Sequence, residues 1–526
     1  MKRKPFRTTI FFTAVLSIIT FLLFAVCEPE EKTEPEKPVL VTNITISNGD
    51  ISLKEGANLK LNVTITPDNA SNKNVTWSSS APEIVAVNDE GIITTVAVGE
   101  ADIIATAKDD SGVSGKVTIT VIPPMPMTAL EIFESLKGQS VITNGWADIY
   151  DDGKGVSYAN PESLILIDDE TYPNPADKYM AFINAFFTNP PNINPNTGVI
   201  SGGTLNDEHK FIILSGDVDL SDGRISDHNK SFYDQFHGPE HTTPHGRVNG
   251  DIILNIGSNT TIIGINNARI MFGGIRINNR ENIIIRNITF WDAHGSTSQN
   301  TQFFSSSTAS IDTLEVRGNS SGIWVDHCKF TNGLCSDLVR NYNHDGGFDI
   351  PQGKNITVSW NEFTNIDKVM LVAGSNDLTN PYDRQITLHH KWFHGNTQRM
   401  PRTRGTQMHI YNNYYNNIGV PGNNGSFMGP GVGAQFIVQN NFFGSKLGNR
   451  NIEWFTGDPP PTPLFHYSGN NIADDNYRWW GSDRIPAGRP SDPMPWIPAY
   501  EYALDDNAVL PTLIPAKAGP TLVFEK

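Results

Sequence analysis

Residues 385–415, QITLHHKWFHGNTQRMPRTRGTQMHIYNNYY, are the stretch from which the fold can be inferred. The stretch begins and ends with one nine-residue phrase, QITLHHKWF at 385–393 and QMHIYNNYY at 407–415. The phrase is a short run of alternating apolar residues, followed by a polar turn and an aromatic residue. Further copies are NIIIRNITF (282–290), GIWVDHCKF (322–330), NITVSWNEF (355–363) and QFIVQNNFF (435–443), with a weaker copy, NTTIIGINN, at 259–267.

The spacing of these copies predicts a solenoid. A single alternating strand cannot bury its own apolar face, whereas stacked copies can. The copies begin about 22 to 40 residues apart, which suits one coil of a parallel β-helix with loops of varying length. Asn fits the turn, because it tolerates the left-handed conformation and can pair with Asn of the next coil. We therefore expect an all-β solenoid over about 251–443, with the tail from about 450 covering its end or its side.

Composition limits the partners. A chain of 526 residues is expected to hold two or more domains. Its net charge of −17 makes nucleic acid an unfavourable partner. A polyanion would need a locally positive site or a metal. The three cysteines have no zinc-type spacing, and Cys328 and Cys335 could form a disulfide or remain thiols.

The amino terminus predicts export. Residues 1–27 carry four basic residues and then an apolar run, as in a signal segment, with an uncleaved membrane anchor as the alternative. Cys27 directly after the run resembles a bacterial lipoprotein signal. Residues 28–38 form a charged tether. These features predict an exported protein, extracellular or a cell-surface (outer-membrane) lipoprotein, whose contact with a membrane is a lipid on Cys27.

Residues 39–122 predict a small β-sandwich, because short alternating runs are separated by turn residues. Their sequence resembles the bacterial Ig-like domain of the BIG2 type, above all in TPDNASNKNVTWSSSAPEIVAVNDEGIITTVAVGEADIIATA (66–107). We expect a spacer here, with carbohydrate or cell-wall binding as the alternative. PPMP (123–126) is the expected linker, and 127–526 the expected second domain.

Three carboxylates form a candidate metal site. Asp345 and Asp349 flank a Gly-Gly turn that lets both side chains point to one place, and Asp312 precedes the neighbouring repeat. Three carboxylates without Cys or His ligands suit a hard cation such as Ca²⁺. Two other interpretations stay open, ordinary turn residues and the acid/base pair of a glycosidase.

Basic residues lie close by in the sequence. Arg399, Arg402 and Arg404 follow one another within the opening stretch, and Lys368 belongs to the repeat before it. Arg grips carboxylates through two parallel hydrogen bonds, so these groups next to a metal site would bind a substrate that carries carboxylates. The alternative is a solvated basic loop.

The longer motifs resemble polysaccharide lyase family 1, the pectate lyases. They are GIWVDHCKF (322–330), NHDGGFDIPQGKNITVSWNEFTNIDKVML (343–371), ITLHHKWFHGNTQRMPRTR (386–404) and MHIYNNYYNN (408–417). The resemblance spans about 200–450 and implies a right-handed parallel β-helix, preceded here by the Ig-like β-sandwich. It also implies Ca²⁺-dependent cleavage of α-1,4-polygalacturonate (pectate) by β-elimination, in pectin degradation. We expect a monomer.

The resemblance also implies a role for each residue of the two clusters. Asp312, Asp345 and Asp349 fall on the calcium ligands. Lys368 and Arg404 fall on substrate-binding residues, with Arg402 in support, and Arg399 falls on the proposed base.

Three alternatives remain. A pectin lyase, which acts on methyl-esterified chains, needs no metal carboxylates. A polygalacturonase would lack its NTD, GHG and RIK motifs here. A carbohydrate-binding β-helix adhesin without enzymatic activity would leave the Asp, Lys and Arg set unexplained.

Overall fold

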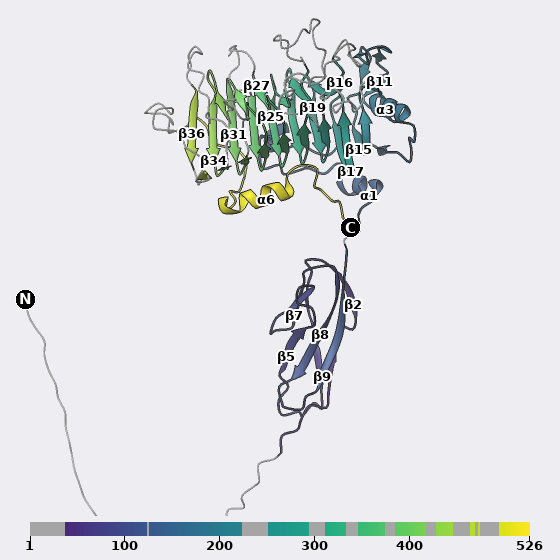
Figure 1. Cartoon of the computed structure of the whole chain (residues 1–526), viewed down its shortest axis with the longest axis vertical. Helices are drawn as coiled ribbons and strands as arrows, with labels where there is room; N and C mark the ends of the chain where they lie inside the picture. The colour runs from purple at the N-terminus through teal and green to yellow at the C-terminus, as the bar shows by residue number, and fades with distance from the viewer. Residues whose placement is uncertain are drawn as a thin grey trace, which may run out of the picture. The chain divides into compact units, whose positions relative to one another are not determined.

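The computed structural model describes residues 37–123, 126–223, 251–293, 311–332, 346–373, 384–416, 428–444, 463–468, 472–473 and 494–525. The chain forms two compact units that divide between Met125 and Pro126 (Figure 1). No helix within the described ranges is long and apolar enough to cross a membrane. The signal segment, the tether and Cys27 lie outside these ranges.

The first unit is a β-sandwich. Its sheets have the strand orders β2-β9-β8-β5, β3-β7-β6 and β1-β4. Its strands are β1 (Asn43–Ile46), β2 (Ile51–Lys54), β3 (Asn58–Lys60), β4 (Val63–Thr66), β5 (Val75–Ser79), β6 (Val85–Val87), β7 (Ile92–Thr95), β8 (Gly99–Ala107) and β9 (Ser114–Ile122). Burial alternates along β1 and β9, as expected when one face of a strand packs against a core. Residues 58–66 hold two separate strands, because β3 pairs with β7 while β4 pairs with β1.

The second unit is a parallel β-helix, in which each repeat contributes two strands to one long sheet (Figure 1). The first strands are β17 (Thr260–Met271), β19 (Glu281–Arg286), β22 (Ser321–Asp326), β25 (Lys354–Ser359), β28 (Arg384–His389), β31 (Thr406–Tyr411), β34 (Gln435–Gln439) and β36 (Leu464–Ser468). The second strands are β20 (Thr289–Trp291), β23 (Lys329–Thr331), β26 (Glu362–Thr364), β29 (Trp392–His394), β32 (Tyr414–Asn416), β35 (Phe442–Phe443) and β37 (Ile472–Ala473). The predicted solenoid is therefore confirmed.

A third side of the β-helix consists of two further parallel sheets, β16-β18-β21-β24 and β27-β30-β33. These strands are β16 (Ile253–Ile256), β18 (Gly274–Asn278), β21 (Leu314–Arg317), β24 (Phe348–Asp349), β27 (Leu371–Val372), β30 (Arg402–Thr403) and β33 (Gly429–Pro430). Four of these strands, β24, β27, β30 and β33, have two residues each. At the amino-terminal end, β10 (Ile165–Ile167) and β15 (Lys210–Asp219) extend the long sheet, with α3 (Pro175–Asn184) beside them.

The nine-residue phrase explains how the coils stack. Its final aromatic residues point into the core and stack in sequence with centroid distances between 4.8 and 5.3 Å; they are Phe290, Phe330, Phe363, Phe393, Tyr415 and Phe443. Its sixth residue adopts φ between +50° and +60° in Asn287, His327, Trp360, His390, Asn412 and Asn440. The predicted Asn pairing at the turn is confirmed between Asn440 and Asn412, at 2.7 Å. Where His or Trp takes this strained position, the rings stack on one another, with Trp360 at 4.2 Å from His390.

The seventh residue of the phrase lies inside the turn and bonds the preceding coil. Asn361, Asn413 and Asn441 each donate from Nδ2 to a backbone carbonyl of the coil before and accept from one of its N–H groups. Lys391 holds the same position, is fully buried, and donates from Nζ to the carbonyl of Val358. Burial lowers the pKa of Lys391 well below its usual value.

Segments from both ends of the unit cover the long sheet. Tyr500 bonds Thr387 at 2.6 Å and His409 at 2.8 Å. The helix α6 (Leu510–Lys517) lies beside the strands of the β-helix (Figure 1), and it buries Leu510 and Ile514 against aromatic residues of the turn and of the second strands. The expected packing of the tail along the side of the solenoid therefore holds for the described part of the tail, 494–525.

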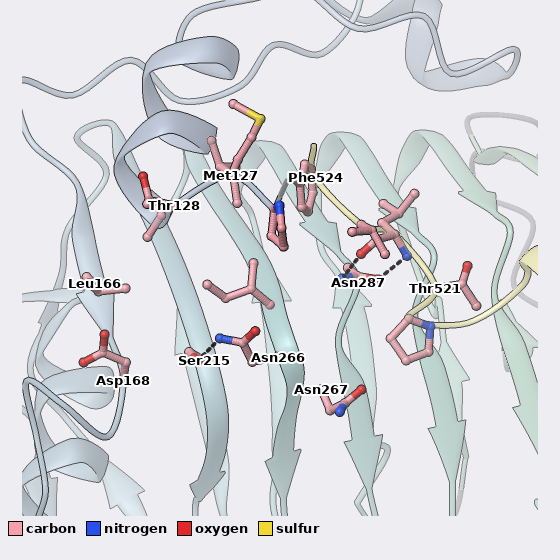
Figure 2. A pocket seen from close by; sticks show the side chains of 17 residues that line it. Met127, Thr128, Leu166, Asp168, Ser215, Asn266, Asn267, Asn287, Thr521 and Phe524 are labelled. Carbon is pink, nitrogen blue, oxygen red and sulfur yellow. Dashed lines mark hydrogen bonds between the residues drawn. The ribbon is translucent and has the colours of Figure 1, made fainter. Parts of the chain in front are cut away.

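The two ends of the unit are joined beside a cavity of about 510 Å³ (Figure 2). Met127, just before α1 (Ala129–Leu136), donates to the carbonyl of Phe524, and Leu522 exchanges two hydrogen bonds with the Asn287 side chain. Of the described residues that the sequence indicated as site residues, none lines this cavity.

Lys391→Asn is expected to stabilise the β-helix. Asn at this position would keep the donor to Val358 and add the acceptor that the other coils have, without burying an amine. We expect the free energy of unfolding to rise by about 1–2 kcal/mol, measured by denaturant unfolding of the β-helical unit. The matched control, Asn413→Lys, should lower it; a destabilised Lys391→Asn would contradict this account.

Candidate active site

The candidate site lies on the third side of the β-helix. Parallel bridges join Gly346 to Lys368 and Lys368 to Gln398, so each residue lies one coil beyond the last. Neighbouring coils are about 4.8 Å apart. The candidate residues of four consecutive coils are, in order, Asp312, Asp349, Lys368 and Arg399. The structure thus brings together the described members of both predicted clusters, with carboxylates on two coils and cations on the next two.

Asp312 and Asp349, the acidic pair, approach each other around Gly346. The N–H of Gly346 donates to Asp312 Oδ1 at 2.8 Å, and the N–H of Leu371 donates to Asp349 Oδ1 at 2.8 Å. A Cβ on Gly346 would lie 2.4 Å from Asp349 Oδ1 and 2.7 Å from Asp312 Oδ1. Only glycine therefore lets the two carboxylates come this close.

The donor chemistry of the acidic pair fits a hard cation, because both side chains offer only carboxylate oxygens. The third predicted ligand, Asp345, lies outside the described residues. Across the ranges that the structure does describe, no cluster of three or more Asp, Glu, His or Cys forms a metal site. Two carboxylates at a glycine cradle are the part of the predicted calcium site that can be located.

The cationic set consists of Lys368, Arg399, Arg402 and Arg404. Lys368 is partly exposed in the coil after Asp349. Arg402 and Arg404 lie two residues apart on the next coil. Their backbone N–H groups donate to the carbonyls of Met370 and Val372. Arg404 is 9% exposed, so its guanidinium lies largely within the wall of the site and not on a solvated loop. This burial argues against the alternative of a free basic loop.

Arg399 has an unusual environment. Its φ is +61°, a left-handed conformation that a long side chain seldom adopts, and the N–H of Met370 donates to its carbonyl at 2.8 Å. Nε and Nη1 of Arg399 are buried and have no hydrogen-bond partner among the described residues. A partly buried guanidinium with two unsatisfied nitrogens is the kind of group that a bound anion would complete.

The WVDH motif (324–327) has a structural role. Asp326 accepts from Arg286 Nε at 2.9 Å and from the Ser359 hydroxyl at 2.6 Å, and it contacts His327 at 2.8 Å. Burial raises the pKa of Asp326, but the charge of Arg286 together with the hydrogen bonds to His327 and Ser359 more than offsets this effect, and the pKa is about 2. Cys328 next to it is a free, buried thiol whose pKa burial raises to about 12; Cys335 lies outside the described ranges.

The histidines of the long sheet are also scaffold. His389 contacts His390 at 2.7 Å and the carbonyl of Thr143 at 2.9 Å, and His390 contacts Asp505 at 2.8 Å. Burial lowers the pKa of both histidines. Neutral, hydrogen-bonded imidazoles on this sheet hold the covering segments in place.

Sequence reasoning missed Glu315 and its two arginines, Arg276 and Arg317. All three point outward on the side that carries the site, because the residues between them along the strands belong to the core. The available signal was the alternation in IDTLEVRG, where Leu314 and Val316 are apolar and the residues after each are charged.

Comparison with known proteins is consistent with this geometry. Residues 192–453 match the pectate lyase family, and residues 40–121 match the group 2 bacterial Ig-like domain. A pectate trisaccharide-lyase of Bacillus licheniformis is 31% identical over 264 residues, which is 50% of this chain and 67% of that protein. This chain belongs to the pectate lyase family, with a bacterial Ig-like domain ahead of the β-helix.

Two other relatives match shorter segments. A pectate trisaccharide-lyase of Thermotoga maritima is 37% identical over 202 residues, 35% of this chain and 50% of that protein. A pectate lyase of Bacillus subtilis is 37% identical over 177 residues, 31% of this chain and 42% of that protein. The chain thus spans about half the length of the first curated relatives that it matches.

Solved structures show the fold. A thermostable pectate lyase superposes with a TM-score of 0.53 at 24% identity, covering 73% of this chain and 98% of that one. A pectate lyase bound to a hexasaccharide superposes with a TM-score of 0.53 at 23% identity, covering 74% and 99%. The predicted fold class, a right-handed parallel β-helix behind an Ig-like sandwich, is confirmed.

Gly346→Ala is expected to weaken Ca²⁺ binding by about tenfold or more, because the added Cβ displaces one carboxylate of a charged ligand pair. Calorimetric titration of the chain with Ca²⁺ measures this change. Gly444→Ala is the matched control, because its Cβ would meet no atom closer than 3.2 Å and no carboxylate. Equal Ca²⁺ affinity in the Gly346→Ala variant and the wild type would show that the acidic pair does not bind the metal.

Proposed function

We propose that this chain is a calcium-dependent pectate lyase that cleaves α-1,4-polygalacturonate by β-elimination and releases 4,5-unsaturated oligogalacturonides. The observation that carries the proposal is the order of charges on successive coils, the acidic pair first and the cationic set next to it. Such a surface suits a chain of sugar carboxylates together with a cation. The names of the relatives, pectate trisaccharide-lyase and pectate lyase, support the same substrate.

The chemical difficulty of the reaction is the weak acidity of the proton on C5, which lies next to a charged carboxylate. Lys368 and Arg404 would bind this carboxylate and offset the negative charge that develops when the proton leaves. Calcium held by Asp312, Asp345 and Asp349 would add positive charge against the same carboxylate. Arg402 would hold a neighbouring sugar carboxylate in support.

Arg399 would act as the base. Its uncharged form would take the C5 proton, the electron pair of the C5–H bond would form the C4–C5 double bond, and the C4–O bond would break. The leaving oxygen would be protonated from solvent. A guanidinium is protonated in water, so the uncharged form must arise during turnover.

Incubation of the chain with polygalacturonate tests the proposal directly. We expect ultraviolet absorbance of the unsaturated product to rise with Ca²⁺ and to stop with excess chelator. New reducing ends without absorbance would indicate hydrolysis and favour Asp345 and Asp349 as a glycosidase pair. Absorbance only with methyl-esterified chains and without Ca²⁺ would indicate a pectin lyase, and no reaction with any pectin would favour a binding protein.

Arg399→Lys is expected to lower kcat by a factor of about 1,000 or more while the affinity for polygalacturonate changes by less than about threefold, since the charge remains but the positioned base is lost. Initial rates give kcat, and affinity electrophoresis gives binding. The Arg402→Lys variant is the matched control on the same coil and should keep most of its turnover. Near-normal turnover in Arg399→Lys would exclude Arg399 as the base.

We further propose that the protein is exported and anchored through a lipid on Cys27, on the basis of the basic and apolar segment before this residue. Metabolic labelling with a lipid precursor should mark the wild type and not Cys27→Ala. Label in both, or in neither, would count against the anchor.

A further inference from the structure

One outward row of side chains crosses the third side of the β-helix. The register pairs Arg276 with Glu315, Glu315 with Asp349 and Leu371 with Arg402, and a bridge between adjacent residues places Asp349 beside Leu371. We call these five residues the outer row. Arg276 lies two coils before Asp349 and Arg402 lies two coils after it, about 10 Å on either side at the usual strand spacing.

Glu315 accepts hydrogen bonds from two arginines. It is 3% exposed, accepts from Arg276 Nε at 2.6 Å through one oxygen, and accepts from Arg317 Nε through the other. Both oxygens are therefore occupied by arginines, so Glu315 does not add a ligand to the acidic pair. The guanidinium groups remain accessible, with side-chain exposures of 25% for Arg276 and 48% for Arg317.

The charge of this cluster is unbalanced. Two arginines on one buried carboxylate leave one net positive charge, whereas the exposed pair of Arg269 and Asp217 elsewhere on the β-helix is neutral. Within the described residues, the hydrogen bonds that the structure shows for Arg276 and Arg317 use Nε and leave the terminal N–H groups available to a ligand. A fixed, partly exposed cation with available donors binds carboxylates well, and in a chain of net charge −17 it is a local attraction for a polyanion.

We propose that Arg276 and Arg317, held by Glu315, form an additional subsite for a sugar carboxylate on the amino-terminal side of Asp349, on the coil of Asp312 and the coil before it. This proposal rests on the proposed function and extends it. The substrate would then be held by cations on both sides of Asp349, with the cationic set on one side and this subsite on the other. Arg317 is the more exposed member and contributes the larger share.

Affinity electrophoresis in gels that contain polygalacturonate tests the subsite without requiring turnover. Arg317→Gln leaves Arg276 on Glu315, and it is expected to weaken binding of polygalacturonate about tenfold, as loss of one charge-assisted hydrogen bond would. Arg317→Lys keeps the charge and should recover part of the loss. Arg269→Gln, the control at an exposed ion pair outside the outer row, should bind as the wild type does.

The values of KM and kcat distinguish weaker substrate binding at the subsite from a slower chemical step. For Arg317→Gln, we expect KM to rise about tenfold with kcat within about twofold of the wild type, and the difference in KM to shrink as salt is added. Unchanged affinity and KM in Arg317→Gln would overturn the subsite, even where the wild type performs the elimination. Weaker binding by Arg317→Gln together with a wild type that performs no elimination would support the subsite as a polyuronate site while refuting the lyase assignment.

Discussion

Parallel hydrogen bonds between neighbouring coils, repeated at one strand spacing, are the interaction on which the rest of this protein depends. They set the distance between residues that are 20 to 40 positions apart in the chain, and the inner aromatic stack keeps the register from coil to coil. The buried Asn side chains add hydrogen bonds between coils within the turn, where strand pairing is interrupted. A residue on the third side therefore has a fixed neighbour in the next coil, so that residues from successive coils can form one site.

The charges on the third side use this repeat. Carboxylates that would repel one another are brought together at Gly346, where the missing side chain leaves room for both. Cations follow on the next two coils, and a second cationic cluster precedes them at Glu315. A strongly acidic protein can thus present a surface that favours a polyanion, because local charge at a distance of one or two coils outweighs net charge spread over the molecule.

The long sheet differs from the third side, because its polar groups are buried under the covering segments. Burial lowers the pKa of His389 and of His390 there, and each of the two is hydrogen-bonded to the cover. Tyr500 and Asp505 come from the tail, and Thr143 comes from the beginning of the unit. Both ends of the unit therefore contribute to the cover of the long sheet.

The sequence by itself determined the solenoid, because a nine-residue phrase that buries one aromatic residue and turns at one left-handed position can be read from local pattern alone. It also determined which Asp, Lys and Arg residues to examine, since their spacing within the repeats is a local property, although Asp345 is beyond the described residues. Only the tertiary structure decided the roles of Glu315, Gly346 and the tail. Glu315 meets Arg276 across 39 residues, Gly346 is needed because two side chains from different coils meet at its Cα, and Tyr500 finds His409 across 91 residues. Contacts of this kind depend on how coils are stacked and covered in space, and no local pattern in the chain encodes that distance.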